Sequence, residues 1–302
     1  MAGLEHGVDA NASLSYDSNI PPLFHAGHLP VVQVGEKKLV WVKHLQSGSF
    51  GEVHEVRDSA SEERYVKKLI NWAAACNLLQ EKASTLKPDN EIYILRGLTH
   101  PRIIKLLGDW VSPDRVCLLM EKCQEDLFRR LYRDGAMNRV NARAYMFQLL
   151  EALAYLQLQE IAHRDVKLEN LLVAASSVGS PDLKLCDFGL ARRCQRSLGC
   201  ATFIGSADYL APEVRKSAEN RNYGFICDSW SCGVVAYALL TALSPYYNDD
   251  ENTLTRSQGL SEHDERVVAG GEPTPASFIR SCMSVVPDER KDPAALADMV
   301  WP

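Results

Sequence analysis

A short polar stretch between a helical pattern and an apolar strand carries three different functional groups. Residues 163–170, HRDVKLEN, place a carboxylate at Asp165, an ammonium at Lys167 and an amide at Asn170. Phosphoryl transfer needs an acid–base group beside the attacking hydroxyl, a cation near the moving phosphate and an oxygen ligand for a metal ion. The stretch therefore predicts phosphoryl-transfer chemistry, and a charged surface turn is the alternative interpretation.

A second candidate metal ligand stands at the end of the next strand pattern. Asp187 is followed by Phe188 and Gly189 and preceded by the strand pattern of residues 183–186. A carboxylate at a strand end can reach a Mg²⁺ ion that bridges the phosphates of ATP. Asp and Gly are also common in turns, so the position of this tripeptide behind residues 163–170 is what gives it weight.

A glycine-containing turn near the start of the chain is suited to holding phosphates. Gly48 and Gly51 enclose Ser49 and Phe50, and a strand pattern resumes at Val53. Backbone N–H groups in such a turn can surround an anion, because glycine lets the backbone approach closely.

The elements that must position these groups differ between the two parts of the chain. Residues 37–120 predict a small, mostly β unit with strand patterns at 39–42, 53–56, 65–70, 103–111 and 116–120 and one main helix. Residues 121–302 predict a mostly helical unit, with helices at 141–159, 230–243 and 293–300 and short strands at 171–174 and 183–186. Residues 1–36 lack periodicity, and we expect a flexible tail.

The order of these motifs resembles that of eukaryotic protein kinases over roughly residues 38–302. H-R-D-x-K-x-x-N is followed by D-F-G at 187–189, A-P-E at 211–213 and a late arginine, Arg290. The resemblance implies a bilobal α+β protein-kinase fold that uses ATP and Mg²⁺. It also implies a base at Asp165, a charge stabiliser at Lys167, metal ligands at Asn170 and Asp187, and a structural pair between Glu213 and Arg290.

The same resemblance implies a lysine on the third strand, held by Glu91 on the following helix. Lys67 and Lys68 are both candidates. Side chains alternate along a strand, so Lys68 shares a face with Val66 and Lys67 shares a face with Tyr65. The valine suits the roof of an adenine site better, which favours Lys68 and leaves Lys67 as the alternative.

Further ATP contacts are implied by position alone. Met120 matches the residue behind adenine, and Glu121, Cys123 and Leu172 complete the implied contacts.

Substrate class and regulation also follow from the resemblance. Lys167 and Ser206 match Ser/Thr kinases, so we expect protein substrates with Ser or Thr acceptors. Thr202 matches an activation-loop phosphosite, which predicts an upstream kinase and phosphate receptors at Arg164 and Arg192. Asp126 and Glu169 match positions that select basic residues in substrates of some families.

Composition restricts the partners and the cellular location. The chain has 302 residues and a formal net charge of −6, which argues against nucleic-acid binding. Its longest apolar run, Cys232–Leu243, is too short to span a membrane. The nine cysteines have no regular spacing, so we expect reduced thiols and a cytoplasmic or nuclear location.

Two other functions stay open at this point. Gln46 stands where a third glycine would complete the glycine-rich motif, and together with the Lys67-Lys68 pair it favours a pseudokinase that acts as a binding scaffold. Gln46 would narrow the space near the ribose without removing a catalytic group. A small-molecule phosphotransferase is the third possibility, which the A-P-E segment opposes.

Overall fold

The computed structural model describes residues 32–34, 37–48, 51–81, 87–175, 182–194, 207–216, 224–245 and 273–301, and the statements below concern these residues. They form two compact units. Unit 1 contains the described residues up to Asn71 together with Leu106–Lys122, and unit 2 contains Trp72–Lys105 and the described residues from Cys123 onward. None of the helices in these stretches is long and apolar enough to cross a membrane.

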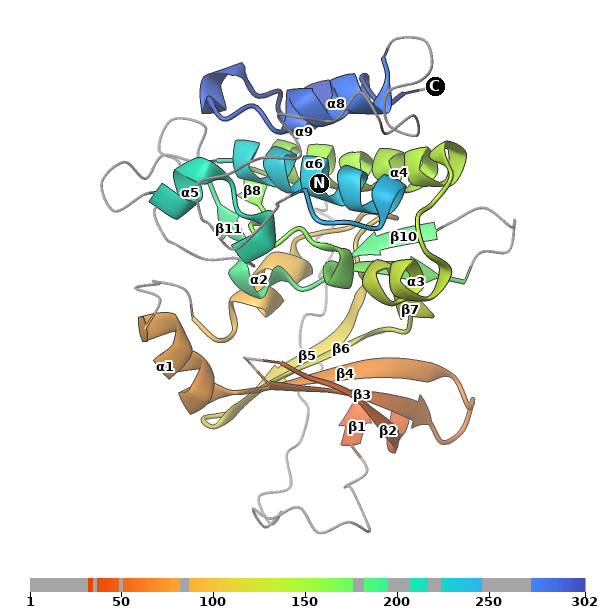
Figure 1. The fold of residues 1–302 in the computed structure, drawn as a ribbon. Helices are drawn as coiled ribbons and strands as arrows, with labels where there is room; N and C mark the ends of the chain where they lie inside the picture. Colours follow the sequence, from red (N-terminus) through yellow and green to blue (C-terminus); the bar gives the residue numbers. More distant parts are fainter. Residues whose placement is uncertain are drawn as a thin grey trace, which may run out of the picture. The chain divides into compact units, whose positions relative to one another are not determined.

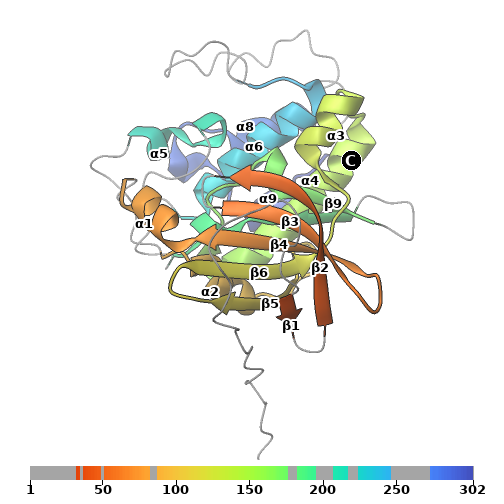
Figure 2. The ribbon, with the colours of Figure 1, turned by 90° about the horizontal axis from the view of Figure 1, so that it is seen from below.

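Unit 1 is a six-stranded antiparallel sheet in the order β1-β2-β3-β4-β6-β5 (Figure 2). Its strands are β1 (Val32–Val34), β2 (Lys37–Gly48), β3 (Gly51–Asp58), β4 (Arg64–Asn71), β5 (Leu106–Val111) and β6 (Arg115–Glu121). Three residues of the predicted tail thus form β1, which pairs with β2. The predicted strands are otherwise present.

The two faces of this sheet carry different residues because side chains alternate along each strand. Leu39, Val56, Tyr65 and Leu119 form a buried cluster on one face. This face therefore has an apolar core of its own. A residue directly next to a cluster member along the same strand points to the opposite face.

Unit 2 is mostly helical (Figure 1). Its helices are α1 (Trp72–Glu81), α2 (Asn90–Arg96), α3 (Leu127–Asp134), α4 (Arg139–Leu158), α5 (Pro212–Lys216), α6 (Ile226–Thr241), α8 (Pro275–Cys282) and α9 (Pro293–Ala297). The α+β class predicted from the sequence is confirmed, with a mostly β first unit and a mostly helical second unit. The predicted boundary at residues 120 and 121 stays a prediction, and α1 and α2 belong to unit 2.

Helices α4 and α6 form the centre of unit 2, with α8 and α9 packed against them (Figure 1). The side chain of Asn138 caps α4 by accepting a hydrogen bond from Asn141 N at 2.9 Å. The predicted apolar stripe of α4 is buried, as at Met146 and Leu150. Helix α6 begins at Ile226, one turn before the predicted start, because the polar side chains near its beginning are used inside the protein instead of marking a loop.

Five short strands complete unit 2. Antiparallel pairing places β9 (Leu171–Ala174) between β7 (Glu125–Asp126) and β10 (Asp182–Leu185), and β8 (Ile161–Ala162) pairs with β11 (Arg192–Arg193). The loop of residues 163–170 therefore connects β8 to β9. Each of these strands pairs with a different neighbour, and this pairing fixes both ends of the loop.

The cysteines differ from one another in bonding state. Cys76, Cys117, Cys123, Cys186, Cys227, Cys232 and Cys282 are free thiols. Cys194 is disulfide-bonded, so the expectation of reduced thiols is wrong at this residue. Proximity in three dimensions decides disulfide formation, and the irregular spacing of the sequence does not reveal it. The cytoplasmic or nuclear location stays a prediction.

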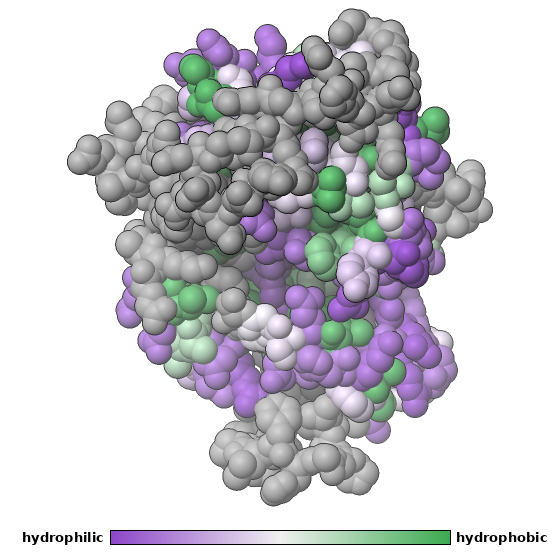
Figure 3. Space-filling view, viewed as in Figure 1, coloured by the Kyte–Doolittle hydropathy of each residue, from purple (hydrophilic) through white to green (hydrophobic). Residues whose placement is uncertain are grey.

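Much of the described surface on the face shown in Figure 3 is hydrophilic, and hydrophobic residues form small separate areas on it. Exposed apolar side chains of this protein include Tyr132, Val140 and Leu158.

Candidate active site

Asp165 is the centre of a polar cluster in unit 2. Its Oδ2 lies 2.7 Å from Lys167 Nζ and accepts a hydrogen bond from Asn170 Nδ2 at 3.0 Å. The same Nδ2 donates to the backbone carbonyl of Asp165 at 2.8 Å. A 3-10 helix, Leu168–Asn170, turns the chain so that Asn170 points back at Asp165. The loop thus brings together the three residues that the sequence assigned to phosphoryl transfer.

Asp228, at the start of α6, holds the backbone of this loop. Its two carboxylate oxygens accept hydrogen bonds from His163 N and Arg164 N, both at 2.8 Å. Arg164 has a φ of 70°, a left-handed conformation that residues other than glycine seldom adopt. Two hydrogen bonds to a buried carboxylate fix this conformation. Burial raises the pKa of Asp228, and these backbone N–H groups oppose the rise.

No role for Asp228 was predicted from the sequence. An aspartate followed by a strongly apolar helix is nevertheless a sequence signal of a buried carboxylate. Only the contacts show which N–H groups that carboxylate serves.

His163 connects the loop to the D-F-G segment. Its Nδ1 accepts a hydrogen bond from Asp165 N at 3.3 Å, and its Nε2 lies 3.1 Å from the carbonyl oxygen of Cys186. These partners require the proton on Nε2 and a neutral ring. Burial lowers the pKa of His163, which agrees with a neutral imidazole. The ring also packs edge-on against Phe188, with the ring centroids 4.8 Å apart.

The D-F-G segment is held by the beginning of α2. Glu91 is buried, and its Oε1 accepts a hydrogen bond from Phe188 N at 3.3 Å. The preceding residue, Asn90, donates to carbonyl oxygens of the same segment. A site role was predicted for Glu91 but not for Asn90, because a polar residue at the start of a helix usually lies on the surface.

Asn170 and Asp187 are the residues that fit a divalent cation. Because Asn170 Nδ2 points to Asp165, its Oδ1 faces elsewhere, and the carbonyl of Asn170 accepts a hydrogen bond from Cys186 N at 2.9 Å. Pairing of β9 and β10 thereby brings Asn170 next to the residue before Asp187. An amide oxygen and a carboxylate are hard ligands of the kind that Mg²⁺ prefers. No cluster of three or more His, Cys, Asp or Glu residues suited to a metal occurs in the described stretches.

The glycine-containing turn lies in unit 1 between β2 and β3. Gly48 pairs with Gly51, and Ser49 and Phe50 lie outside the described residues. A Cβ atom on Gly51 would lie 1.8 Å from the carbonyl oxygen of Leu69, so only glycine allows β3 to approach β4 here. Gln46 is an exposed residue of β2, upstream of the turn.

Strand pairing in unit 1 places the two candidate lysines on opposite faces of the sheet. Lys68 pairs with Val53, and Val66 pairs with Met120, so these four residues share one face. Lys67 lies on the other face. Its Nζ is 5.3 Å from the centre of the Trp110 ring, and burial lowers its pKa.

The remaining residues of the predicted nucleotide site are placed as follows. Glu121 ends β6 in unit 1 and pairs with Tyr65, Cys123 is half-buried in unit 2, and Leu172 lies on β9 opposite Lys184.

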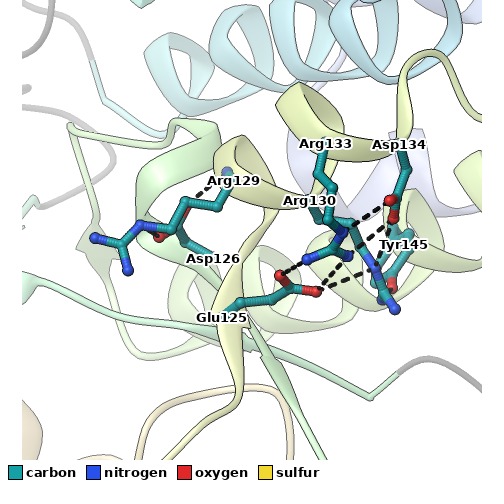
Figure 4. A network of polar contacts seen from close by, with 7 residues as sticks. All are labelled: Glu125, Asp126, Arg129, Arg130, Arg133, Asp134 and Tyr145. Carbon is teal, nitrogen blue, oxygen red and sulfur yellow. Dashed lines mark hydrogen bonds and ion pairs between the residues drawn. The ribbon is translucent and has the colours of Figure 1, made fainter.

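A polar network surrounds the segment that follows Cys123 (Figure 4). Arg133 binds both carboxylate oxygens of Glu125, at 2.6 and 3.1 Å, and Arg130 Nε lies 3.5 Å from the same carboxylate. Asp126 caps α3 by accepting from Arg129 N at 2.8 Å, and its other oxygen lies 3.3 Å from Arg129 Nε. Asp126, which was expected to select basic residues in substrates, is therefore already paired with Arg129 of the helix that it caps.

The predicted Glu213–Arg290 pair is confirmed. Arg290 Nη1 and Nη2 donate to the two carboxylate oxygens of Glu213 at 2.6 and 3.0 Å, and Nη2 also donates to the carbonyl of Ser284 at 2.8 Å. The candidate regulatory residues Thr202 and Ser206 lie outside the described residues.

Comparison with known proteins agrees with this geometry. Residues 40–301 match the protein kinase domain family, and the chain belongs to this family. Membership implies that the domain uses ATP together with a divalent metal ion.

The relatives of this chain include two that are serine/threonine-protein kinases by name. The chain is 35% identical to the meiosis-specific serine/threonine-protein kinase mek1 of Schizosaccharomyces pombe over 226 residues, which is 71% of this chain and 49% of mek1. It is 32% identical to the human RAC-beta serine/threonine-protein kinase over 216 residues, 71% of this chain and 43% of that protein. A probable myosin light chain kinase of Dictyostelium discoideum is 37% identical over 194 residues, 64% of this chain and 38% of that protein. The chain thus spans about half or less of the length of these relatives.

Proposed function

We propose that this protein is a Ser/Thr protein kinase that transfers the γ-phosphate of ATP to Ser or Thr hydroxyls of protein substrates. The observation that carries the proposal is the cluster in which Lys167 and Asn170 both contact one carboxylate oxygen of Asp165. Three groups with the acid–base, cationic and metal-binding properties of phosphoryl transfer converge there.

Each side chain of the cluster has a distinct task in this proposal. Asp165 orients the substrate hydroxyl and accepts its proton. Lys167, which already pairs with Asp165, stabilises negative charge on the transferred phosphoryl group. The hydrogen bonds from His163 N and Arg164 N to Asp228 keep the loop rigid, so that Asp165 does not have to reorganise during the reaction.

Mg²⁺ is the divalent ion that we propose for this site. Asn170 and Asp187 would hold it through oxygen atoms, and it would neutralise charge on the phosphates of ATP. The commitment of Asn170 Nδ2 to Asp165 supports this role, because it leaves the oxygen of the amide for the metal.

Lys68 is the lysine that we propose for the α- and β-phosphates of ATP. The pairing of Lys68 with Val53, and of Val66 with Met120, supports it, since these are the residues expected around the nucleotide. Lys67 packs over Trp110 on the other face and has a structural role instead. Glu91 accepts a hydrogen bond from Phe188 N, and the partnership of Glu91 with Lys68 stays a prediction from the sequence.

The test is transfer of labelled phosphate from ATP and Mg²⁺ to a mixed peptide library. Wild type should label Ser and Thr, and Asp165→Asn should reduce the rate by at least about 100-fold, the low end of the contribution of a general base. Lys68→Met should reduce the rate much more than Lys67→Met. Wild-type transfer no greater than that of Asp165→Asn would overturn the proposal.

A scaffold without catalysis is the competing function, and its sequence basis is Gln46. Thermal unfolding with ATP, with and without Mg²⁺, distinguishes the two. A kinase should be stabilised by the nucleotide more strongly when Mg²⁺ is present, because a ligand that binds only the folded state raises the unfolding temperature.

Regulation by phosphorylation of Thr202 by an upstream kinase is a further part of the proposal. Arg164, a buried residue of the catalytic loop, is the proposed partner of the phosphate. Wild type phosphorylated at Thr202 should be more active than Thr202→Ala. Equal activity of the two would remove this part while leaving the catalytic proposal intact.

A further inference from the structure

The amide of Asn90 is surrounded by carbonyl oxygens of the segment that follows Asp187. Asn90 Nδ2 lies 2.9 Å from the carbonyl oxygen of Ala191, 3.3 Å from that of Gly189 and 3.4 Å from that of Phe188. Asn90 is the first residue of α2 and is half-buried. The two N–H bonds of one amide are therefore shared among three backbone acceptors, two in the 3-10 helix Phe188–Leu190 and one at Ala191, the residue that follows it.

Glu91 contacts the same segment as a hydrogen-bond acceptor. Its carboxylate accepts from Phe188 N at 3.3 Å, whereas Asn90 donates to the carbonyls. The ends of a short helix leave backbone groups without partners inside the helix, and buried polar groups need partners. Two consecutive side chains of α2 thus satisfy both kinds of backbone group in the D-F-G segment.

The conformation of Asp187 explains why such a clamp matters. Asp187 has a φ of 64°, in the left-handed region, which costs a residue other than glycine about 1 kcal/mol or more. A strained conformation persists only where its surroundings fix it. On one side the ring of Phe188 is fully buried against His163, and on the other α2 holds the backbone of residues 188–191.

We propose that Asn90 is a positioning residue that holds the D-F-G segment in the conformation in which Asp187 would bind the divalent ion. The proposal rests on the proposed kinase function for its catalytic consequence, but its structural part does not. The required property is the N–H donor, since the acceptors around it are carbonyl oxygens. The volume of the side chain is secondary.

Three substitutions separate the donor from the volume. Asn90→Leu keeps the approximate size and removes the donor. Asn90→Asp keeps the shape, removes the donor and adds a carboxylate beside Asp89 and Glu91. Asn90→Gln keeps the NH₂ group at the end of a longer side chain. Tyr93→Leu is the matched control, because Tyr93 lies on the same helix and is 65% exposed.

The experiment measures kcat, the KM for ATP and the Mg²⁺ dependence of each variant with the full chain. We expect Asn90→Leu and Asn90→Asp to lower kcat about tenfold or more and to require more Mg²⁺, since loss of buried hydrogen bonds of this kind shifts a local equilibrium by about that factor. Asn90→Gln should recover most of the activity, and Tyr93→Leu should stay within about twofold of wild type. A structural role in packing alone would make Asn90→Leu the mildest change and would leave the Mg²⁺ dependence unaltered.

Amide hydrogen exchange supplies a readout that does not depend on catalysis. Without nucleotide, the amides of Phe188 and Ala191 should exchange faster in Asn90→Leu than in wild type or Asn90→Gln. Unchanged exchange in Asn90→Leu, or a kcat within twofold of wild type, would overturn the proposal. Equal defects in the Leu and Gln variants would also overturn it. If wild type itself transfers no phosphate, the kinase function fails, and the exchange result still decides the role of Asn90.

Discussion

Replacement of Asp228 by asparagine tests whether one buried carboxylate holds the catalytic loop. The carboxylate is 2% exposed and accepts from His163 N and Arg164 N at 2.8 Å each. A hydrogen bond to a charged acceptor contributes about 1.5–3 kcal/mol, so the two together contribute about 3–6 kcal/mol before the cost of burying the charge. Asn keeps one acceptor oxygen but turns an NH₂ group toward the other N–H. We therefore expect Asp228→Asn to lower the free energy of unfolding of unit 2 by about 2–4 kcal/mol.

The assay is urea unfolding followed by intrinsic tryptophan fluorescence, to which Trp230 and Trp301, both buried in unit 2, contribute. Ser229→Ala is the matched control. Ser229 is the next residue of the same helix and is fully buried, and its Oγ makes no hydrogen bond within the described part of the chain. Removing this hydroxyl should leave stability unchanged or raise it slightly, by up to about 1 kcal/mol. Hydrogen exchange of the amides of His163 and Arg164 should be faster in Asp228→Asn and unchanged in Ser229→Ala.

A loss of less than about 0.5 kcal/mol in Asp228→Asn, with unchanged exchange at His163 and Arg164, would refute the reasoning. Such a result would mean that the free-energy cost of burying the carboxylate cancels the stabilisation from its two hydrogen bonds. The left-handed conformation of Arg164 would then have another origin.

Three further predictions follow from particular contacts. Gly233→Ala should lower the free energy of unfolding by about 1–2 kcal/mol in urea titrations, because the new Cβ would lie 2.4 Å from Met283 Cγ and overpacking outweighs the gain in helix propensity. Burial lowers the pKa of His54 in the folded protein below its unfolded value. The neutral ring therefore contributes its full stability above about pH 6.5, and this contribution is lost as the pH falls below that value. The unfolding temperature of His54→Gln should accordingly depend less on pH between about 7 and 5 than that of wild type. Arg129→Ala should increase selection for basic residues on a peptide array, since it removes the cation paired with Asp126, and an unchanged array profile would contradict this role.

The candidate site is predictable from the sequence to the extent that it depends on nearby residues. Asp165, Lys167 and Asn170 lie within six consecutive residues of one loop, so local geometry can bring them together, as the contacts around Asp165 show. The apolar stripe of α4 is equally local, because helical periodicity places its members on one side.

Contacts between distant segments are outside the reach of such patterns. Asp228 is 64 residues from Arg164, and Asn90 is 98 residues or more from the carbonyls that it binds. A polar residue at the start of a helix has the same appearance in the sequence whether it faces water or a buried loop. The early beginning of α6 and the role of Asn90 were missed for this reason.

The choice between Lys67 and Lys68 shows the same division. The alternation of side chains along a strand, known from the sequence, requires the two lysines to face opposite ways. Which of them faces Met120 depends on the register of β4 against β6, and hydrogen bonding between strands fixes that register. The sequence by itself determined the protein kinase family, the order of the motifs and the groups available for chemistry, because these are properties of residue type and spacing. Tertiary structure alone decided which N–H and carbonyl groups hold the loop and the D-F-G segment, because buried polar groups must find partners wherever the fold brings them.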